Sequence, residues 1–231
     1  TKLSVLVNGL DDGASTGDIR RLLDYRSHGI SDFLKTITAF SDKPIIGLME
    51  ARFPKNTDFL GRMRTLSSVQ QFLDNNIVPK FLEKDMAEMS ADHVSFVKQH
   101  LFNFLENIYK FKEELVDLSD YKIGNIIFAS ILIDKDLDFK AAIDSFCEVC
   151  QISNRIKIIE ASKLPLNLVG VLKSGTLLPN EASIVLSRTT DQIHETYQVS
   201  NPLSLNQIRK ISSLELDEKI RHLKLLEVNT K

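Results

Sequence analysis

A short acidic, glycine-bearing segment holds the residues best suited to chemistry. Residues 11–20 read DDGASTGDIR and follow the apolar run Leu3–Val7, which predicts a buried strand. A helix-like sequence comes next, and ligands of open α/β sheets collect at such strand–turn–helix connections. Backbone N–H groups at a helix N-terminus attract anions, and glycines let the chain approach a phosphate closely. The carboxylates of Asp11 and Asp12 are suited to hold a divalent cation or sugar hydroxyls.

Two familiar phosphate-site motifs do not fit this segment. A P-loop has a lysine before its hydroxyl residue, and the segment contains no lysine. Phosphatase loops of the haloacid dehalogenase type place two aspartates two positions apart. Asp11 and Asp12 are adjacent, so an extended backbone would point them to opposite sides. The alternative to a ligand site is an ordinary strand–helix connection in which Ser15 or Thr16 caps the helix.

Composition excludes several classes of function. The chain has 231 residues, 43% hydrophobic and 26% charged, which suits one globular domain with an insertion. A net charge of -2 gives no basic field for nucleic acid, and the apolar runs are too short to span a bilayer. We expect a cytoplasmic protein that binds neither. The chain enters a strand at once and has no Gly-x-Gly, so we expect a truncated sequence that lacks the natural N-terminus.

The pattern of apolar residues predicts an α/β chain with a helical insertion. Strand and helix signals alternate over residues 1–50, whereas residues 58–119 show apolar spacings of three and four throughout. One apolar stripe in that region comprises Val94, Val97, Leu101, Phe104, Leu105, Ile108 and Phe111. We interpret the stripe as a packed helix face, and residues 58–119 as an insertion in a single domain that spans residues 1–231.

The second half of the chain mixes both kinds of element. Residues 121–130 are apolar nearly all round and predict a buried helix. Strands are predicted at residues 155–159, 168–172 and 184–186, and amphipathic helices over residues 199–231. Cys147 and Cys150 lie at a predicted helix C-terminus, where no helix dipole favours a thiolate, so we interpret them as packing residues.

Five blocks in the same order resemble the CofD-like family, which includes 2-phospho-L-lactate transferase and the bacterial gluconeogenesis factors. The first is residues 11–20, similar to the signature DDGGSSGRLR. The others are ISDFLKTI (residues 30–37), the pair Arg52-Phe53, YKIGNIIFASIL (residues 121–132), and Gly175 followed by Glu181. Each block is short, and their order across residues 3–186 carries the resemblance.

The resemblance implies a Rossmann-like three-layer α/β/α fold that binds a nucleotide-diphosphate-linked metabolite. In the transferase branch, a phospholactyl-type group passes from a guanosine diphosphate carrier to a deazaflavin alcohol, with Mg²⁺. In the gluconeogenesis-factor branch, the ligand is a nucleotide sugar and the role is regulatory. The sequence departs from the family where an arginine becomes Asp18, and it gains Lys35 and Lys122. A lysine is a point charge and does not replace bidentate phosphate recognition by arginine.

On this basis we predict a transferase-like site in one shared crevice. The predicted catalytic residues are Asp11, Asp12 and Asp32, and the first two are also the predicted Mg²⁺ ligands. The predicted ligand- and phosphate-binding residues are Gly13, Ser15, Thr16, Gly17, Arg20, Lys35, Gly124 and Asn125. Two alternatives stay open: a non-catalytic nucleotide-sugar-binding regulator, and a pseudo-enzyme whose helical insertion binds a partner. A homodimer is also left open.

Overall fold

The computed structural model describes residues 2–56, 58–111, 117–186 and 193–228. They fall into two compact units, and each is considered by itself. The helical unit contains residues 1–7 and 30–159, and the sheet unit contains residues 8–29 and 160–231.

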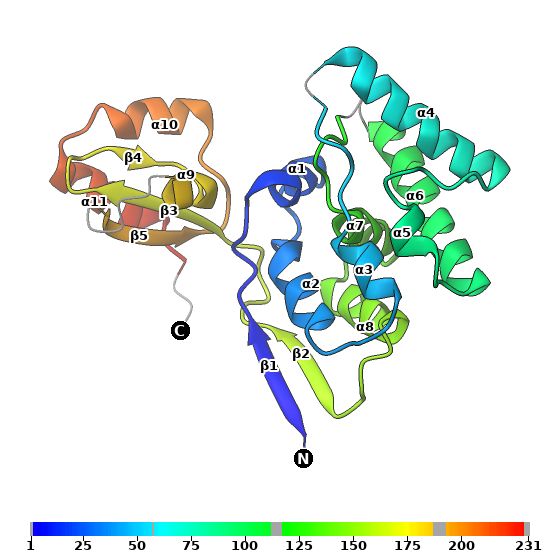
Figure 1. The fold of residues 1–231 in the computed structure, drawn as a ribbon. Coiled ribbons are helices and arrows are strands. Elements are labelled where there is room, and N and C mark those ends of the chain that lie inside the picture. The colour runs from blue at the N-terminus through cyan, green and yellow to red at the C-terminus, as the bar shows by residue number, and fades with distance from the viewer. Residues whose placement is uncertain (1, 57, 112–116, 187–192, 229–231) are drawn as a thin grey trace. The chain divides into compact units, whose positions relative to one another are not determined.

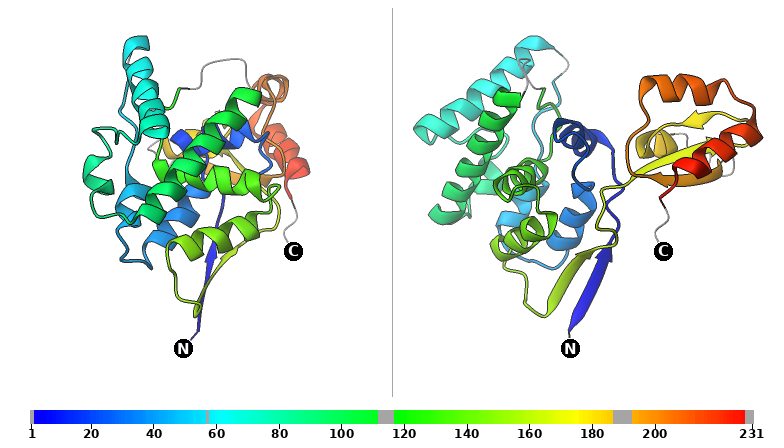
Figure 2. Two further views of the ribbon diagram at one scale, coloured as in Figure 1. Left: turned by 90° about the vertical axis from the view of Figure 1, so that its right-hand side faces the viewer. Right: turned by 180° about the vertical axis from the view of Figure 1, so that it is seen from behind.

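The helical unit is built around one buried helix. Its elements are β1 (Leu3–Val7), α2 (Ile30–Thr38), α3 (Ile45–Glu50), α4 (Phe59–Asn75), α5 (Glu83–Met86), α6 (Ala91–Phe111), α7 (Ile123–Asp134), α8 (Phe139–Val149) and β2 (Ile156–Glu160). Every residue of α7 from Ile123 to Leu132 is buried, and α7 contacts α2, α3, α6 and α8 (Figures 1 and 2). A helix that is apolar all round needs such complete cover, so the buried helix predicted here is confirmed.

The two strands of the helical unit run in the same direction. The N–H of Leu3, at the start of β1, donates to the carbonyl of Arg155, which directly precedes β2, at 2.8 Å. Figure 1 shows both arrows pointing the same way. Parallel strands need a crossover connection, and the helices α2 to α8 supply it within this unit.

The sheet unit is a small antiparallel sheet with helices on both faces. Its elements are α1 (Ala14–Leu22), β3 (Asn167–Leu172), β4 (Leu177–Leu178), α9 (Glu181–Leu186), β5 (Ile193–Val199), α10 (Leu205–Ser212) and α11 (Leu216–Leu226), and the strand order is β4-β3-β5 (Figure 1). On one face, Val169 and Val171 belong to a core shared with Ile211 of α10 and Leu223 of α11. The opposite face of β3 carries Gly170, which packs against α9.

The predicted mixture of helices and strands is confirmed, but one predicted strand is wrong. Residues 184–186 belong to α9, whose first turn is capped by the Asn180 side chain accepting from the Ser183 N–H at 2.8 Å. Three apolar residues alone cannot separate a strand from a helix. The described strands form one pair and one three-stranded sheet, so the Rossmann-like sheet is not confirmed.

The region predicted to be all-helical contains α4, α5 and α6. Within its predicted stripe, Val97, Leu101, Phe104 and Ile108 are buried, and the Phe111 side chain lies outside the described part. None of the described helices combines the length and the apolarity that crossing a bilayer requires.

Removal of a buried aromatic side chain from α7 should lower the stability of the protein. Phe128 is fully buried in α7, and its ring lies 5.3 Å and 5.6 Å from the rings of Phe139 and Phe146. We expect Phe128→Ala to lower the free energy of unfolding by about 3–5 kcal/mol, because buried apolar area is lost and a cavity forms. Urea denaturation followed by circular dichroism measures this. Leu205→Ala, at an exposed position, is the control and should change stability by less than about 0.5 kcal/mol.

Candidate functional site

The acidic turn leads directly into α1 in the sheet unit. Gly13 is the N-cap, with φ -86° and ψ 149°, so the alternative of a Ser15 or Thr16 cap is wrong. The Gly13 carbonyl accepts from Thr16 and Gly17, and the Gly13 N–H donates to Asp11 Oδ1 at 3.1 Å. The Asp11 carboxylate therefore lies at the N-terminal end of α1. Amides at a helix N-terminus favour an anion there.

Ala14 adopts a conformation that glycine prefers. Its φ is +44°, in the left-handed region where a side chain adds strain. The CofD-like signature has a second glycine at this position. The backbone thus takes the shape for which that signature is suited, although the residue differs.

Two glycines allow the acidic turn to pack against its neighbours. A Cβ at Gly17 would lie 2.2 Å from the Asp12 carbonyl oxygen, and one at Gly29 would lie 2.2 Å from the Asp11 carbonyl oxygen. No side chain fits at either distance. The requirement for glycine at position 17 therefore comes from packing of α1 on the turn, whatever else the residue contacts.

Arg20 is fully buried and ties three segments of the sheet unit together. Its Nε donates to the Ser27 carbonyl at 3.2 Å, and its Nη2 donates to the Leu166 carbonyl and to Asn167 Oδ1, each at 2.9 Å. Its Nη1 lies 3.5 Å from Asp12 Oδ1. Buried guanidinium groups need such partners, since an unpaired one would be strongly destabilising. Arg20 was predicted to bind phosphate, but most of its N–H donors are thus bonded to groups of the protein.

Burial sets the electrostatics of the Asp12–Arg20 pair. Loss of water raises the pKa of Asp12 above its usual value, and the nearby positive charge of Arg20 only partly opposes this. Loss of water likewise lowers the pKa of Arg20, opposed by the charge of Asp12. Each group therefore depends on the other to stay charged.

A small cleft adjoins this pair, and Glu181 reaches it from α9. The Asp12 N–H donates to Glu181 Oε2 at 3.3 Å. The cleft has a volume of about 80 Å³ and is lined by Asp12, Arg20, Tyr25, Asn167, Leu168, Pro179, Asn180, Glu181, Pro202, Leu203 and Ile208. Ligand pockets are usually about 300–1,000 Å³, so the cleft suits one small polar group of a ligand rather than a whole nucleotide.

Three residues that line the cleft were not among the predicted site residues: Tyr25, Asn167 and Glu181. Glu181 stood in the fifth block of the resemblance, but nothing local placed it beside Asp12, which is 169 positions away. Ser15 and Thr16, which were predicted ligand residues, are both buried in α1.

The other predicted site residues lie in the helical unit, on α2 and α7. Asp32 and Lys35 form an exposed ion pair at 3.1 Å. Asn125 is buried, and its Nδ2 donates to Ser31 Oγ at 3.3 Å. A Cβ at Gly124 would lie 2.6 Å from the Met49 carbonyl oxygen, so close packing on α3 requires this glycine. These residues belong to a different unit from Asp11 and Asp12, so the shared crevice stays a prediction.

The cysteines do not form a reactive pair. Burial raises the pKa of Cys147 to about 11 and that of Cys150 to about 12, so both thiols stay protonated and inert near neutral pH. This agrees with their interpretation as packing residues. Within the described ranges, no group of three or more His, Cys, Asp or Glu side chains is arranged to hold a metal ion.

Comparison with known proteins finds a similar fold. Neither the protein-family models nor the curated proteins include a match to the chain. Two structures of protein BH3568 from Bacillus halodurans are similar, with TM-scores of 0.52 and 0.51 and 18% sequence identity in each case. One of them is described as a member of the UPF0052 family. Each match covers 91% of this chain and 48% of BH3568, so the chain spans about half the length of that protein.

UPF0052 is the family of the CofD-like proteins and gluconeogenesis factors. The likeness shows a fold similar to that of a UPF0052 protein. At 18% identity, it concerns the arrangement of the chain and names no substrate.

Close packing at Gly17 leads to a stability prediction. We expect Gly17→Ala to lower the free energy of unfolding by about 1–3 kcal/mol, because the added Cβ collides with the Asp12 backbone. Gly13→Ala is the matched control, since its Cβ would meet only Asp11 Oδ1 at 3.4 Å and its φ is negative. Urea denaturation compares the two variants, and equal losses would contradict the close approach at Gly17.

His28 leads to a prediction about pH. Burial lowers the pKa of His28 to about 4, so the folded protein keeps the imidazole neutral while the unfolded chain binds a proton near pH 6.5. Stability from this group is complete above about pH 6.5 and is lost as the pH falls towards 4, by about 3 kcal/mol. His28→Gln should flatten this part of the stability profile. His194→Gln, at an exposed position, should leave the slope unchanged.

Proposed function

We propose that this chain is a CofD-like protein that binds a nucleotide-diphosphate-linked metabolite at the acidic turn of the sheet unit. The observation that carries the proposal is the corner formed by the amides of α1, the Asp11 and Asp12 carboxylates and the adjoining cleft. The likeness in fold to a UPF0052 protein supports it. We also infer a Rossmann-like fold, supported by the parallel β1–β2 pair and its helical crossover.

The balance of charge implies that a divalent cation accompanies the ligand. Three carboxylates lie around the turn: those of Asp11, Asp12 and Glu181. Most N–H donors of Arg20 are hydrogen-bonded to protein groups. A diphosphate alone would therefore meet repulsion. Mg²⁺ suits such a place, because it is commonly held by one or two carboxylates together with substrate phosphates and water. Asp11 and Asp12 would hold it, and when bound it would neutralise phosphate charge.

In the transferase branch, the protein would act mainly by positioning the reacting groups and not by forming a covalent bond to them. In this proposal the amides of α1 hold a phosphate, Asp11 and Asp12 orient the reacting groups, and Asp32 contacts the acceptor. Lys35, Gly124 and Asn125 are proposed to contribute further ligand contacts. The reaction would be transfer of a phospholactyl-type group in the cytoplasm.

One observation favours the regulatory alternative. The guanidinium of Arg20 is fixed by Ser27, Leu166 and Asn167, so it is not free to follow charge that develops on a leaving phosphate. Such a site can bind a nucleotide sugar without turning it over. The second candidate function is therefore a non-catalytic nucleotide-sugar-binding regulator that uses the same turn.

Thermal unfolding with nucleotides tests the binding site. We expect a guanosine- or uridine-diphosphate compound with Mg²⁺, at about one hundred times its Kd, to add about 2.7 kcal/mol of stability to the full chain. Without Mg²⁺ the gain should largely disappear. Asp11→Asn should abolish the gain, because it removes a carboxylate from the proposed cation site.

The matched control is Asp18→Asn, which removes a carboxylate from the exposed Asp18–Arg21 ion pair on the same helix. This variant should keep the gain. If neither class of nucleotide stabilises the wild-type chain, the proposal fails. Mass spectrometry of the mixtures then distinguishes the two branches, since a regulator forms no product from its nucleotide sugar.

A further inference from the structure

The backbone amide of Asp12, in the acidic turn of the sheet unit, is already covered by an anion of the chain itself. Its N–H donates to Glu181 Oε2, and the nitrogen and oxygen atoms are 3.3 Å apart. Backbone amides of turns near a helix N-terminus are donors that phosphate oxygens use. A carboxylate oxygen is also a negatively charged acceptor. Glu181 therefore occupies a position at the turn that also suits an oxygen of a ligand phosphate.

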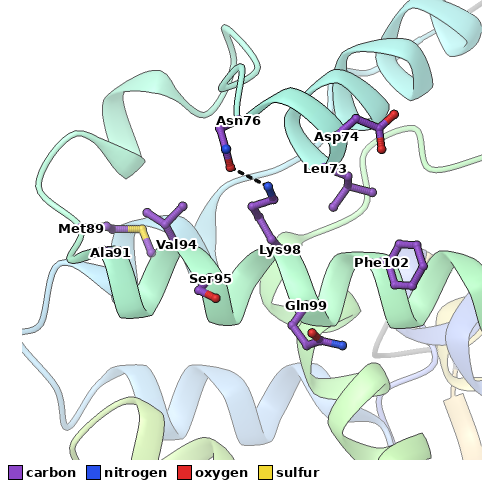
Figure 3. A pocket seen from close by; sticks show the side chains of 10 residues that line it. All are labelled: Leu73, Asp74, Asn76, Met89, Ala91, Val94, Ser95, Lys98, Gln99 and Phe102. Carbon is purple, nitrogen blue, oxygen red and sulfur yellow. Dashed lines mark hydrogen bonds between the residues drawn. The ribbon is translucent and has the colours of Figure 1, made fainter.

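The Glu181 side chain also helps to keep the adjoining cleft small. It lines the cleft together with Pro179 and Asn180, which precede it, and with Asp12 and Arg20. The volume of this cleft is about 80 Å³. By contrast, two hollows in the groove between α4 and α6 of the helical unit measure about 790 Å³ and 410 Å³, and Figure 3 shows the larger one. A phosphate that enters the small cleft therefore gains room when the Glu181 side chain moves out.

The charges around the turn favour the exchange of one anion for another. Three carboxylates lie there, those of Asp11, Asp12 and Glu181, and the guanidinium of Arg20 already donates to protein groups. A phosphate that entered beside all three carboxylates would be repelled by each of them, because like charges at short range raise the free energy. A phosphate that takes the place of Glu181 meets one carboxylate fewer. The exchange therefore lowers the electrostatic cost of binding.

The contact between Glu181 and Asp12 can open at low cost. Its length of 3.3 Å exceeds the length of about 2.7–2.9 Å that is typical of strong hydrogen bonds to charged groups. Glu181 is half-buried, and all of α9 is at least partly exposed, so the side chain can rotate toward water. The helix itself is anchored by Ile184, which packs against Gly170. Rotation of one side chain is therefore enough to uncover the Asp12 amide, without movement of α9.

We infer that Glu181 is an internal competitor of the ligand: its carboxylate covers the Asp12 amide until a phosphate of the ligand displaces it. This inference rests on the proposed function and concerns the regulation of the same site. Binding then requires the open arrangement, in which Glu181 has turned away from Asp12. If about one molecule in ten is open, the apparent Kd is about ten times that of a permanently open chain. A ligand is retained when its phosphate binds the turn better than Glu181 does.

Substitution of Glu181 tests the inference through the direction in which the affinity changes. Calorimetric titration of the full chain uses guanosine diphosphate, uridine diphosphate and inorganic pyrophosphate as probes, each with Mg²⁺. For a probe that binds the wild-type chain, Glu181→Ala should lower the Kd about tenfold, because the competing carboxylate is gone. Glu181→Gln should lower the Kd by less, because its amide oxygen still accepts from the Asp12 N–H. The matched control is Glu218→Ala, which removes the same side chain at an exposed position of α11 and should leave the Kd unchanged.

Hydrogen exchange without any probe tests the contact by itself. The Asp12 amide, followed by NMR, should exchange faster in Glu181→Ala than in the wild-type chain or in Glu218→Ala, because it has lost its acceptor. Circular dichroism verifies that each variant stays folded.

Two outcomes would overturn the inference and leave the proposed function in place. One is an unchanged or higher Kd in Glu181→Ala, since a higher value would make Glu181 a contributor to binding. The other is an Asp12 amide that exchanges at the same rate in Glu181→Ala and in the wild-type chain. If no probe binds the wild-type chain or any variant, the proposed function fails, and this inference fails with it.

Discussion

The buried guanidinium of Arg20 is the interaction on which the candidate site depends. It joins the acidic turn, the Ser27 loop and the start of β3 through hydrogen bonds to groups that come from three separate stretches of chain. A charge removed from water is tolerable only when its donors find partners, so each stretch is held where Arg20 needs it. The position of Asp12 beside the cleft is therefore a consequence of burying one arginine.

This arrangement determines what the turn can offer to a ligand. With the arginine committed to the protein, the exposed chemistry of the corner consists of amides and carboxylates. Gly17 and Gly29 let the backbones of Asp12 and Asp11 pass within distances that any side chain would block. A rigid corner of this kind is suited to recognising an anion together with its cation, and it is less suited to an anion alone.

Local patterns predicted the parts of the fold that local forces decide. The apolar run at residues 3–7 was recognisable as a strand and the uniformly apolar α7 as a buried helix, because the two patterns differ over several residues. The predicted burial of that strand is wrong, since only Val7 is buried and Leu3 and Leu6 are exposed. The acidic turn and α1 followed from the same reasoning. The contact of Glu181 with Asp12 joins residues far apart in sequence, and α9 was mistaken for a strand because its Asn180 cap went unrecognised. Residues 1–7 belong to the helical unit and residues 8–29 to the sheet unit, and no local pattern in the sequence indicates this division.

Helix α4 illustrates a limit of periodicity as evidence. A helix that covers one core has one apolar face, but α4 buries Val69 and Phe72 inward and presents Met63 and Leu73 on a second face. In the sequence the two faces overlap into a diffuse apolar pattern, which indicates only that the segment is helical. The two faces are distinct in the structure, because the residues of the inner face are buried within the helical unit. The second face lines the groove between α4 and α6, so it meets a partly open surface rather than the core.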